Sequence, residues 1–410
     1  MSSPTKSIGC DVTKAPSPPM NFPVSGFPII PDGQRWEEEN YELFKPGYYY
    51  PVNIGDVLVS KYQIVGKLGW GSTSTVWLAR DLEAHQYVTL KIYAQNEEIV
   101  NEFGIYQYLE RIASKSTYPG RQNVRTAIGT FVIPRPGGDH ECLVQPATWE
   151  SWRDLLYRIP SGVFNEELLK LSLKQLLLAL DFLHSECKII HTDSKGDNML
   201  HSIFDQTLLT DFAAAEMEGP SPRKIVDGVP IYASRRFGFP KALGPVVLGD
   251  FRSAVKGEEK RNHNAGPDIY RAPEVIIKAD WSYPVDIWNV GVLIWDLFEG
   301  KHLFCNLNEE NGVLDYSTGT HLAEIIGALG PPPLDLLERG IRSDEWFHKD
   351  GTWKAEIEIP EDASLDKLEV RYVEGEHKTQ FMHFVRCMLQ WRPEDRKTAK
   401  ELLQHPWLNL

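Results

Sequence analysis

Several features that mark particular protein classes are missing from this sequence. Its 410 residues include only five cysteines, which show no paired spacing for a zinc site or a disulfide framework. No run of about eighteen apolar residues occurs, so we expect no transmembrane helix, and no clear secretory signal is present. Acidic residues outnumber basic ones by 57 to 43, for a net charge of −14. We expect a monomeric protein of the cytoplasm or nucleus, without direct nucleic-acid binding.

One short segment combines an acid, a cation and an amide. His191–Asn198 reads H-x-D-x-K-x-x-N, and phosphoryl transfer uses each polar member at this spacing. Asp193 can orient a substrate hydroxyl and accept its proton, Lys195 can neutralise charge on the moving phosphoryl group, and Asn198 can hold a metal ion. A polar turn can reach this spacing by chance, so the neighbouring motifs decide its meaning.

A glycine-rich stretch lies upstream, at Leu68–Val76. Gly69 and Gly71 allow backbone N–H groups to approach phosphates because no Cβ intervenes, whereas Ser74 replaces a third glycine. A strand-like run beyond the stretch carries Lys91. Such a glycine pair alone is usually a turn, and such a lysine alone is usually solvated. Their order along the chain favours a phosphate-binding loop followed by a phosphate-binding lysine.

Apolar residues at helical spacing follow Lys91 and predict a helix that supplies a glutamate partner for this lysine. Glu102 is our candidate for the partner. Because the stretch of chain between Lys91 and Glu102 is short, Glu98 is the alternative.

Two Asp-Phe pairs compete for the role of metal ligand. Asp211 lies 13 residues after Asn198, whereas Asp250 lies 52 residues after it. The Ala-Pro-Glu motif that ends at Glu274 lies 24 residues beyond Asp250 but 63 beyond Asp211. Since an activation segment of about two dozen residues is ordinary, we assign the Mg²⁺ ligand to Asp250 and interpret residues 201–245 as an insertion.

Together these motifs resemble a eukaryotic protein kinase of the SR-protein kinase family, in a fungal-type branch. Thr192, in place of an arginine, is typical of that family, and so is an insertion before the Asp-Phe element. Further matching motifs are Tyr49–Val52 with Gly55-Asp56, Lys67–Gly71, Ser74–Leu78, Pro267–Glu274 and Asp286–Gly291, and the resemblance covers 41–410, ending at His405–Leu408.

The resemblance implies an ATP- and Mg²⁺-dependent serine/threonine kinase with an α+β, bilobal protein-kinase fold. The mostly β small lobe would span about 55–145 and the mostly α large lobe about 149–410. Independently of the resemblance, the Ser-Pro-rich composition of residues 1–40 predicts a disordered extension. Adenine would meet the carbonyl of Pro146 and the N–H of Thr148. The implied ATP-binding residues are Leu68, Gly69, Trp70, Gly71, Ser72, Thr73, Ser74, Thr75, Val76, Lys91, Glu102, Pro146 and Thr148; Asp193 and Lys195 would be catalytic, and Asn198 and Asp250 would bind metal.

The resemblance also implies two bracing contacts in the large lobe. Asp286 would support the catalytic loop from a helix below it. Glu274 and Arg396 would form an ion pair that ties the activation segment to the large lobe, although two unrelated surface charges are the alternative.

The activation segment lacks the usual phosphorylation site. Between Asp250 and Glu274 the hydroxyl residues are Ser253 and Tyr270, and Thr192 cannot pair ionically with a phosphate. We therefore predict activity that does not depend on phosphorylation of this segment.

Protein substrates with Arg/Ser-rich, splicing-type segments are what the resemblance implies, and the negative charge suits a basic substrate. The acidic docking positions of the family correspond here to Thr320 and Gly327, which carry no charge. Arg252 replaces a flexible glycine, and Pro267 replaces a threonine that contacts the catalytic acid. Arg252, Pro267 and the short spacing from Lys91 to Glu102 motivate the alternative to an active kinase, a pseudokinase that acts as a nucleotide-binding scaffold.

Overall fold

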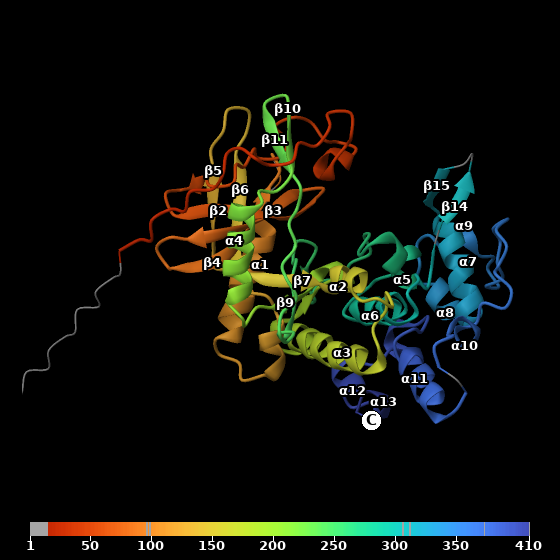
Figure 1. Ribbon diagram of the computed structural model, residues 1–410. Coiled ribbons are helices and arrows are strands. Elements are labelled where there is room, and N and C mark those ends of the chain that lie inside the picture. Colours follow the sequence, from red (N-terminus) through yellow and green to blue (C-terminus); the bar gives the residue numbers. More distant parts are fainter. Residues whose placement is uncertain are drawn as a thin grey trace, which may run out of the picture. The chain divides into compact units, whose positions relative to one another are not determined.

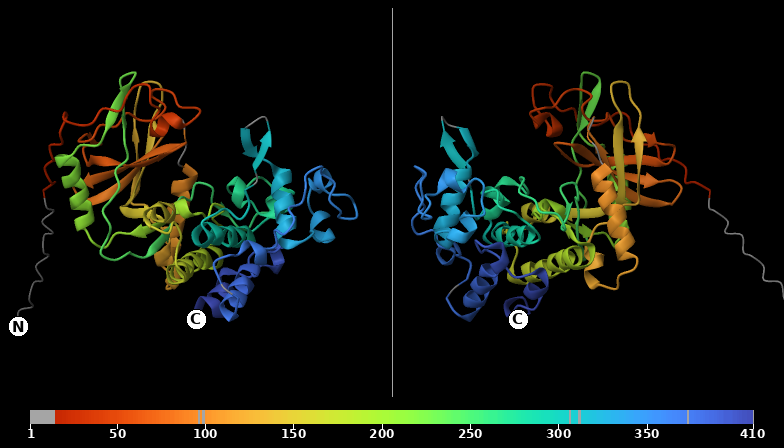
Figure 2. Two further views of the ribbon diagram at one scale, coloured as in Figure 1. Left: turned by 45° about the vertical axis from the view of Figure 1, so that its right-hand side comes forward. Right: turned by 180° about the vertical axis from the view of Figure 1, so that it is seen from behind.

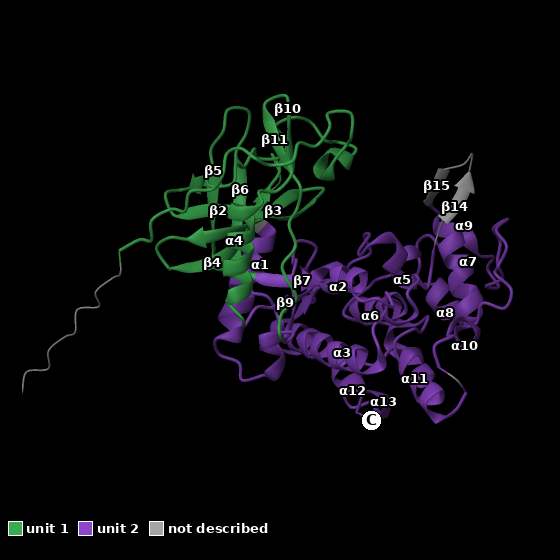
Figure 3. Ribbon diagram, in the orientation of Figure 1, with its two compact units in different colours: residues 1–99, 127–147, 205–241 green, residues 100–126, 148–204, 242–410 purple. Residues whose placement is uncertain are grey.

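The computed structural model describes residues 15–95, 97, 100–305, 307–310, 313–372 and 374–409. The chain forms two compact units whose segments alternate along the sequence (Figure 3). The first unit comprises Met1–Ile99, Ala127–Ala147 and Asp205–Lys241, and the second comprises Val100–Thr126, Thr148–Phe204 and Ala242–Leu410.

These units differ from the expected lobes at two places. Residues 100–126, which we expected in the small lobe, belong to the second unit. Tyr106 of this segment packs edge-on against Phe251, with ring centroids 5.2 Å apart. Most of the expected insertion, Asp205–Lys241, belongs to the first unit.

An antiparallel sheet of six strands forms the centre of the first unit (Figure 1). Its strand order is β1-β2-β3-β4-β6-β5. Apolar side chains from alternate positions, such as Trp77, Ala79, Val88 and Leu90, share one buried cluster, as the two-residue period of a strand requires. The strands are β1 (Val57–Leu58), β2 (Tyr62–Gly71), β3 (Ser74–Asp81), β4 (Gln86–Tyr93), β5 (Gly129–Ile133) and β6 (His140–Pro146).

The inserted segment packs on this sheet. It contains helix α4 (Thr207–Glu218) and the hairpin β10 (Arg223–Val226) and β11 (Val229–Tyr232). A Cβ on Gly66 would lie 2.7 Å from the ring of Phe212, so glycine permits the close approach of α4 to β2. Tyr232 completes the sheet's buried cluster beside Trp77, with ring centroids 5.7 Å apart.

Residues 15–40 also pack on the first unit, which differs from the disorder that we expected. Ile30 is buried, and the backbone of Met20 exchanges two hydrogen bonds with the side chain of Gln63. A short 3-10 helix, η1 (Glu37–Asn40), brings acidic side chains to the buried Lys67. The expectation for residues 1–14 lies outside the described residues.

Buried ion pairs join η1 to the sheet and to the insertion. Lys67 Nζ lies 2.9 Å from Glu37 and also pairs with Glu38. Burial raises the pKa of Glu38, and the Lys67 ammonium opposes this rise. Lys224 lies 2.6 Å from Glu39, so this basic residue of the insertion is paired within the fold.

The second unit is mostly helical (Figures 1 and 2). No helix among its described residues, or among those of the first unit, is long and apolar enough to cross a membrane. Its helices are α1 (Val100–Ala113), α2 (Trp152–Arg158), α3 (Glu166–Asp181), α5 (Pro273–Ile276), α6 (Pro284–Ile294), α7 (Thr318–Leu329), α8 (Leu334–Leu337), α9 (Ser343–Trp346), α10 (Leu365–Leu368), α11 (Glu376–Arg386), α12 (Ala399–Leu403) and α13 (Pro406–Asn409).

Short strands position the loops of the second unit. β12 pairs with β9, and β9 with β7, while β13 pairs with β8. The bounds are β7 (Thr148–Ser151), β8 (Ile189–Ile190), β9 (Met199–Ser202), β12 (Val246–Leu248), β13 (Val255–Lys256), β14 (Leu307–Glu310) and β15 (Val313–Tyr316). Val246 pairs with His201 in the β9–β12 ladder, so the residues at the start and at the end of the insertion lie next to each other.

A buried histidine in α7 predicts acid-sensitive stability. Burial, with a smaller contribution from Arg271, lowers the pKa of His321 to about 3, against about 6.5 in an unfolded chain. Above pH 6.5 both states are neutral; as the pH falls below that value only the unfolded state gains the proton. We expect His321 to cost about 2 kcal/mol of stability by pH 5.

Urea unfolding of the wild type and His321→Gln at pH 7.5 and pH 5 measures this effect. The glutamine variant should lose about 2 kcal/mol less than the wild type between the two pH values. If both proteins lost the same free energy of unfolding between the two pH values, the lowered pKa assigned to His321 would be contradicted.

Candidate active site

The glycine-rich stretch forms the β2–β3 hairpin of the first unit. Gly71 pairs with Ser74 across the turn, and Gly69 pairs with Val76. The Tyr49 hydroxyl donates to the carbonyl oxygens of Gly71 at 2.8 Å and Ser72 at 3.1 Å, and so supports the tip of the hairpin. This bracing was not expected from the sequence, which marks Tyr49 only as part of a family motif.

The other expected nucleotide contacts are divided between the units. Lys91 lies on β4, and Pro146 ends β6, both in the first unit. Glu102 is buried in α1, and Thr148 begins β7, both in the second unit. The pairing of Lys91 with Glu102 stays a prediction, and the alternative, Glu98, lies outside the described residues.

The catalytic loop gathers its three polar side chains around one carboxylate. Asp193 Oδ2 accepts a hydrogen bond from Asn198 Nδ2 at 2.9 Å and lies 3.2 Å from Lys195 Nζ. Asn198 also donates to the Asp193 backbone carbonyl at 2.8 Å. The second oxygen, Asp193 Oδ1, has no hydrogen-bond partner among the described residues. Oδ1 is buried, while the Asp193 side chain as a whole keeps 16% of its surface accessible, so the carboxylate can still accept a hydrogen bond from a substrate hydroxyl.

Asp286 of α6 braces this loop, as the resemblance implies. Its carboxylate accepts hydrogen bonds from the backbone N–H of His191 at 2.9 Å and of Thr192 at 2.7 Å. It also lies 2.8 Å from His184 Nε2. The carboxylate is fully buried, so these donors offset its desolvation.

Asp250 lies beside the catalytic loop within the second unit. Strand β12 leads into Gly249, whose carbonyl oxygen is 2.9 Å from His191 Nε2. Phe251, which follows Asp250, is buried, and its ring packs edge-on against that of His191 with the ring centroids 5.0 Å apart. Asp211 is an exposed residue of α4 in the first unit. The assignment of the metal ligand to Asp250 rather than Asp211 stays a prediction.

Arg125 is a charged residue near Glu102 and Asp250 that the sequence motifs did not reveal. Its backbone N–H donates to Leu248 at 2.9 Å, which places Arg125 beside the strand that leads to Asp250. Burial lowers the pKa of its guanidinium, and the nearby Tyr106, Glu102 and Asp250 oppose this shift. Arg125 belongs to no sequence motif, and its position next to the buried Asn123 and Val124 is visible only in the structure.

Two cavities adjoin the catalytic loop within the second unit. The first, of about 470 Å³, is lined by Asp193, Lys195, Ser253, Trp281 and residues 263–267 of the activation segment. The second, of about 610 Å³, shares Lys195 and Pro267 with the first. Its acidic lining residues are Asp197 and Asp296. The catalytic carboxylate therefore faces a space that continues along the loop.

The activation segment is anchored without a phosphate. The Thr192 hydroxyl donates to the Ser253 carbonyl oxygen at 3.0 Å and so joins the catalytic loop to the start of this segment. Tyr270 is buried and donates its hydroxyl to Asp296, so it is protected from modification.

Treatment of the purified protein with a broad-specificity phosphatase should consequently leave its phosphate-transfer rate within about twofold of the untreated rate. Initial rates before and after treatment, with the phosphatase removed, measure the effect. A loss of most activity would show that a phosphate orders the segment.

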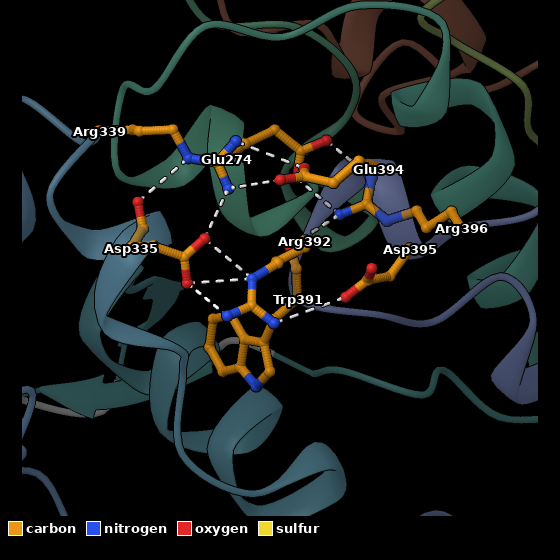
Figure 4. Close-up of polar contacts among 8 residues, drawn as sticks. All are labelled: Glu274, Asp335, Arg339, Trp391, Arg392, Glu394, Asp395 and Arg396. Atoms are coloured by element: carbon orange, nitrogen blue, oxygen red, sulfur yellow. Dashed lines mark hydrogen bonds and ion pairs between the residues drawn. The ribbon is translucent and has the colours of Figure 1, made fainter.

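Glu274 and Arg396 form the expected ion pair (Figure 4). Both side chains are fully buried, and two parallel hydrogen bonds of 2.6 and 2.7 Å join the guanidinium to the carboxylate. The guanidinium also lies over the ring of Trp288 at 5.0 Å. An exposed pair, Arg392 and Asp335, lies nearby.

Comparisons with known proteins agree on one family. The model of the protein kinase domain matches residues 62–236 and 241–408. A serine/threonine protein kinase of Aspergillus fumigatus is 44% identical, with 96% of each chain covered. The serine/threonine-protein kinase SRPK of Physarum polycephalum is 30% identical, with 91% of each chain covered. SRSF protein kinase 3 of Mus musculus is 24% identical, also with 91% of each chain covered.

A solved structure supports the fold. The crystal structure of a kinase domain superposes with a TM-score of 0.66 at 22% identity, and covers 88% of this chain and 99% of that one.

Proposed function

Because this chain belongs to the protein kinase family and is SR-protein kinase-like, we propose that it phosphorylates serine in basic segments of proteins. It is a serine/threonine protein kinase. The proposal concerns which segments of proteins the enzyme phosphorylates and which of its residues bind ATP and catalyse the transfer.

The arrangement around Asp193 carries the proposal. Its Oδ2 is held by Asn198 and Lys195, its Oδ1 has no partner among the described residues, and it lines the cavity of about 470 Å³. Asp193 would align the serine hydroxyl and take its proton during transfer. Lys195 would compensate the charge that develops on the phosphoryl group.

Protein kinases generally use ATP and Mg²⁺. The carboxylate of Asp250 and the amide oxygen of Asn198 are hard oxygen donors, which suit Mg²⁺. These residues would hold the ion, which supplies charge neutralisation at the phosphates. The β2–β3 hairpin and Lys91 would bind the phosphates, and the carbonyl of Pro146 and N–H of Thr148 would meet the adenine.

A basic substrate is supported by the acids of the second cavity. Asp197 lies 3.0 Å from the exposed Arg153, and Asp296 lies 2.8 Å from the exposed His302. The Asp197–Arg153 pair is exposed on both sides and contributes little stability, so a substrate guanidinium can replace Arg153 at small cost. Asp296 is less accessible and also accepts a hydrogen bond from Tyr270. The protein's net charge of −14 favours association with cationic segments.

Long Arg/Ser repeats are less favoured as substrates than short basic segments. The docking positions Thr320 and Gly327 lie on α7 and carry no charge. A Cβ on Gly327 would lie 3.1 Å from the Pro360 carbonyl oxygen, so the face of α7 at this position is covered by the chain itself. We propose that the protein phosphorylates individual serines rather than moving along a repeat.

Phosphate transfer to three peptides tests this proposal: a short Arg-Ser peptide, a long Arg/Ser repeat, and a peptide with Glu replacing each Arg. We expect transfer to both basic peptides, little transfer to the acidic peptide, and release of repeat intermediates bearing one phosphate. Equal rates on the basic and acidic peptides, or a fully phosphorylated repeat without intermediates, would contradict it. Asp193→Ala is the control for contaminating kinases.

A further inference from the structure

Helix α11 contacts α13 (Figure 1). Three side chains with metal-binding atoms meet there. His383 lies on α11 and Cys387 caps its C-terminus, four residues later, so both side chains lie on one face of the helix. His405 directly precedes α13. One ligand atom from each residue lies within 4.8 Å of the other two. We propose that His383, Cys387 and His405 form a binding site for a divalent metal ion of the zinc type.

The ligand types suit that class of ion. Imidazole nitrogen and cysteine sulfur are the donors that zinc and its neighbours prefer over the oxygen donors that suit Mg²⁺. Three protein ligands leave a fourth tetrahedral position for water. His405 is buried, whereas His383 is exposed. The site is therefore anchored in the fold and open to an ion from solvent.

The packing of His405 holds its ring in place. The ring lies 5.1 Å from that of Phe384 and is inclined by 26° to that of His383, with centroids 4.9 Å apart. Phe384 in turn packs against the fully buried Trp407 of α13. The aromatic neighbours thus direct one nitrogen of His405 toward His383 before any ion arrives, which reduces the ordering needed for binding.

The two imidazoles face each other through nitrogen atoms. His383 Nδ1 lies 2.7 Å from His405 Nε2, a distance at which the two atoms share one proton. Burial lowers the pKa of His405, and the proximity of His383 lowers it further. The His405 ring therefore reaches the neutral form that metal ligation requires more readily than a free imidazole does. An ion between the two nitrogens would take the place of the shared proton.

The proton balance of binding involves two further groups. The Trp407 backbone N–H donates to His405 Nδ1 at 3.2 Å, so the proton of the neutral ring resides on Nε2. When a metal ion binds Nε2, the proton of the ring moves to Nδ1. The hydrogen bond from the Trp407 N–H to Nδ1 is then lost. Cys387 binds as thiolate and releases its proton to solvent; burial raises the pKa of this thiol, Lys397 opposes the rise and Glu401 adds to it.

A metal ion at this site would cross-link α11 to the segment that begins α13. Because the ligands come from two elements that are separated by nearly twenty residues, the complete site exists only in the folded chain, and the ion binds the folded state preferentially. We expect the ion to raise the thermal stability of the second unit. The catalytic residues lie elsewhere in that unit, so phosphate transfer need not depend on the ion.

Titration of the metal-free full chain with Co²⁺, followed by Zn²⁺, tests the site. Thiolate ligation to Co²⁺ should give a near-ultraviolet charge-transfer band that saturates at one equivalent and disappears when Zn²⁺ displaces Co²⁺. His383→Gln and Cys387→Ser should each weaken Zn²⁺ binding by roughly 100-fold or more. Cys305→Ser is the matched control, because Cys305 is an exposed free cysteine outside the cluster, and its binding should equal that of the wild type.

Thermal unfolding gives an independent readout. Zn²⁺ should raise the unfolding temperature of the wild type and Cys305→Ser but not of His383→Gln or Cys387→Ser. Far-ultraviolet circular dichroism and retained phosphate transfer would establish that these variants are folded. Absence of the charge-transfer band in the wild type, or Zn²⁺ binding that survives both ligand substitutions, would overturn the proposal.

Discussion

Asp250→Asn is expected to lower phosphate transfer by roughly 1,000-fold or more, because an amide cannot neutralise Mg²⁺ as a carboxylate does. Asp250 follows Gly249, whose carbonyl oxygen lies 2.9 Å from His191 of the catalytic loop. The apparent affinity for Mg·ATP should also fall, since the variant loses a ligand of the ion. Initial rates over a range of Mg²⁺ concentrations measure both effects.

Asp211→Asn is the matched control for this substitution. Asp211 also precedes a phenylalanine, and it is nearer in sequence to Asn198. It is exposed on α4 of the first unit, so its replacement should change the rate by less than about twofold. A large loss in Asp211→Asn together with an active Asp250→Asn would show that the wrong aspartate was assigned.

Arg396→Met is expected to destabilise the second unit by about 3–5 kcal/mol, because it leaves the carboxylate of Glu274 buried without its cation. Both side chains of the pair are fully buried. A double variant, Glu274→Leu with Arg396→Met, should recover much of this loss, since no unpaired charge remains in the core. Urea unfolding of the three proteins, followed by tryptophan fluorescence, measures the differences.

Arg392→Met provides the comparison for the Arg396 result. Arg392 also makes two hydrogen bonds through its Nε and Nη2 to one carboxylate, that of Asp335. Its pair is exposed, with 38% and 51% of the two side chains accessible, so its loss should cost at most about 1 kcal/mol. If Arg396→Met cost no more than Arg392→Met, the buried pair would not hold the activation segment as proposed.

The parts of the site that the sequence predicted depend on local spacing. Asp193, Lys195 and Asn198 fall within six residues, so the loop that joins them leaves little freedom in how their side chains meet. Asp250 lies far along the chain from Asn198, but its distance to Glu274 identified it. The pairing of β9 with β12 holds the two ends of the insertion together whatever the length of the insertion. The distance from Asp250 to Glu274 is therefore more informative than the distance from Asn198 to Asp250.

The contacts that the sequence did not predict join distant segments. Glu37 receives a hydrogen bond from the Ser234 hydroxyl at 2.7 Å, although 197 residues separate the two. No periodicity or motif reports such a contact, and the polar composition of residues 15–40 instead suggested disorder. Arg125 was missed for a related reason, because its importance comes from Glu102 and Asp250 rather than from its sequence neighbours.

The measurement that tests the central claim most directly is Mg²⁺-dependent transfer of the γ-phosphate of ATP to a basic serine peptide, by the wild type and by Asp193→Ala. We predict transfer by the wild type, a loss of roughly 1,000-fold or more in the variant, and nucleotide affinity within about threefold of the wild type. Equal transfer by both proteins would contradict the role of Asp193. Nucleotide binding without transfer by the wild type would instead support a scaffold that binds ATP without catalysis.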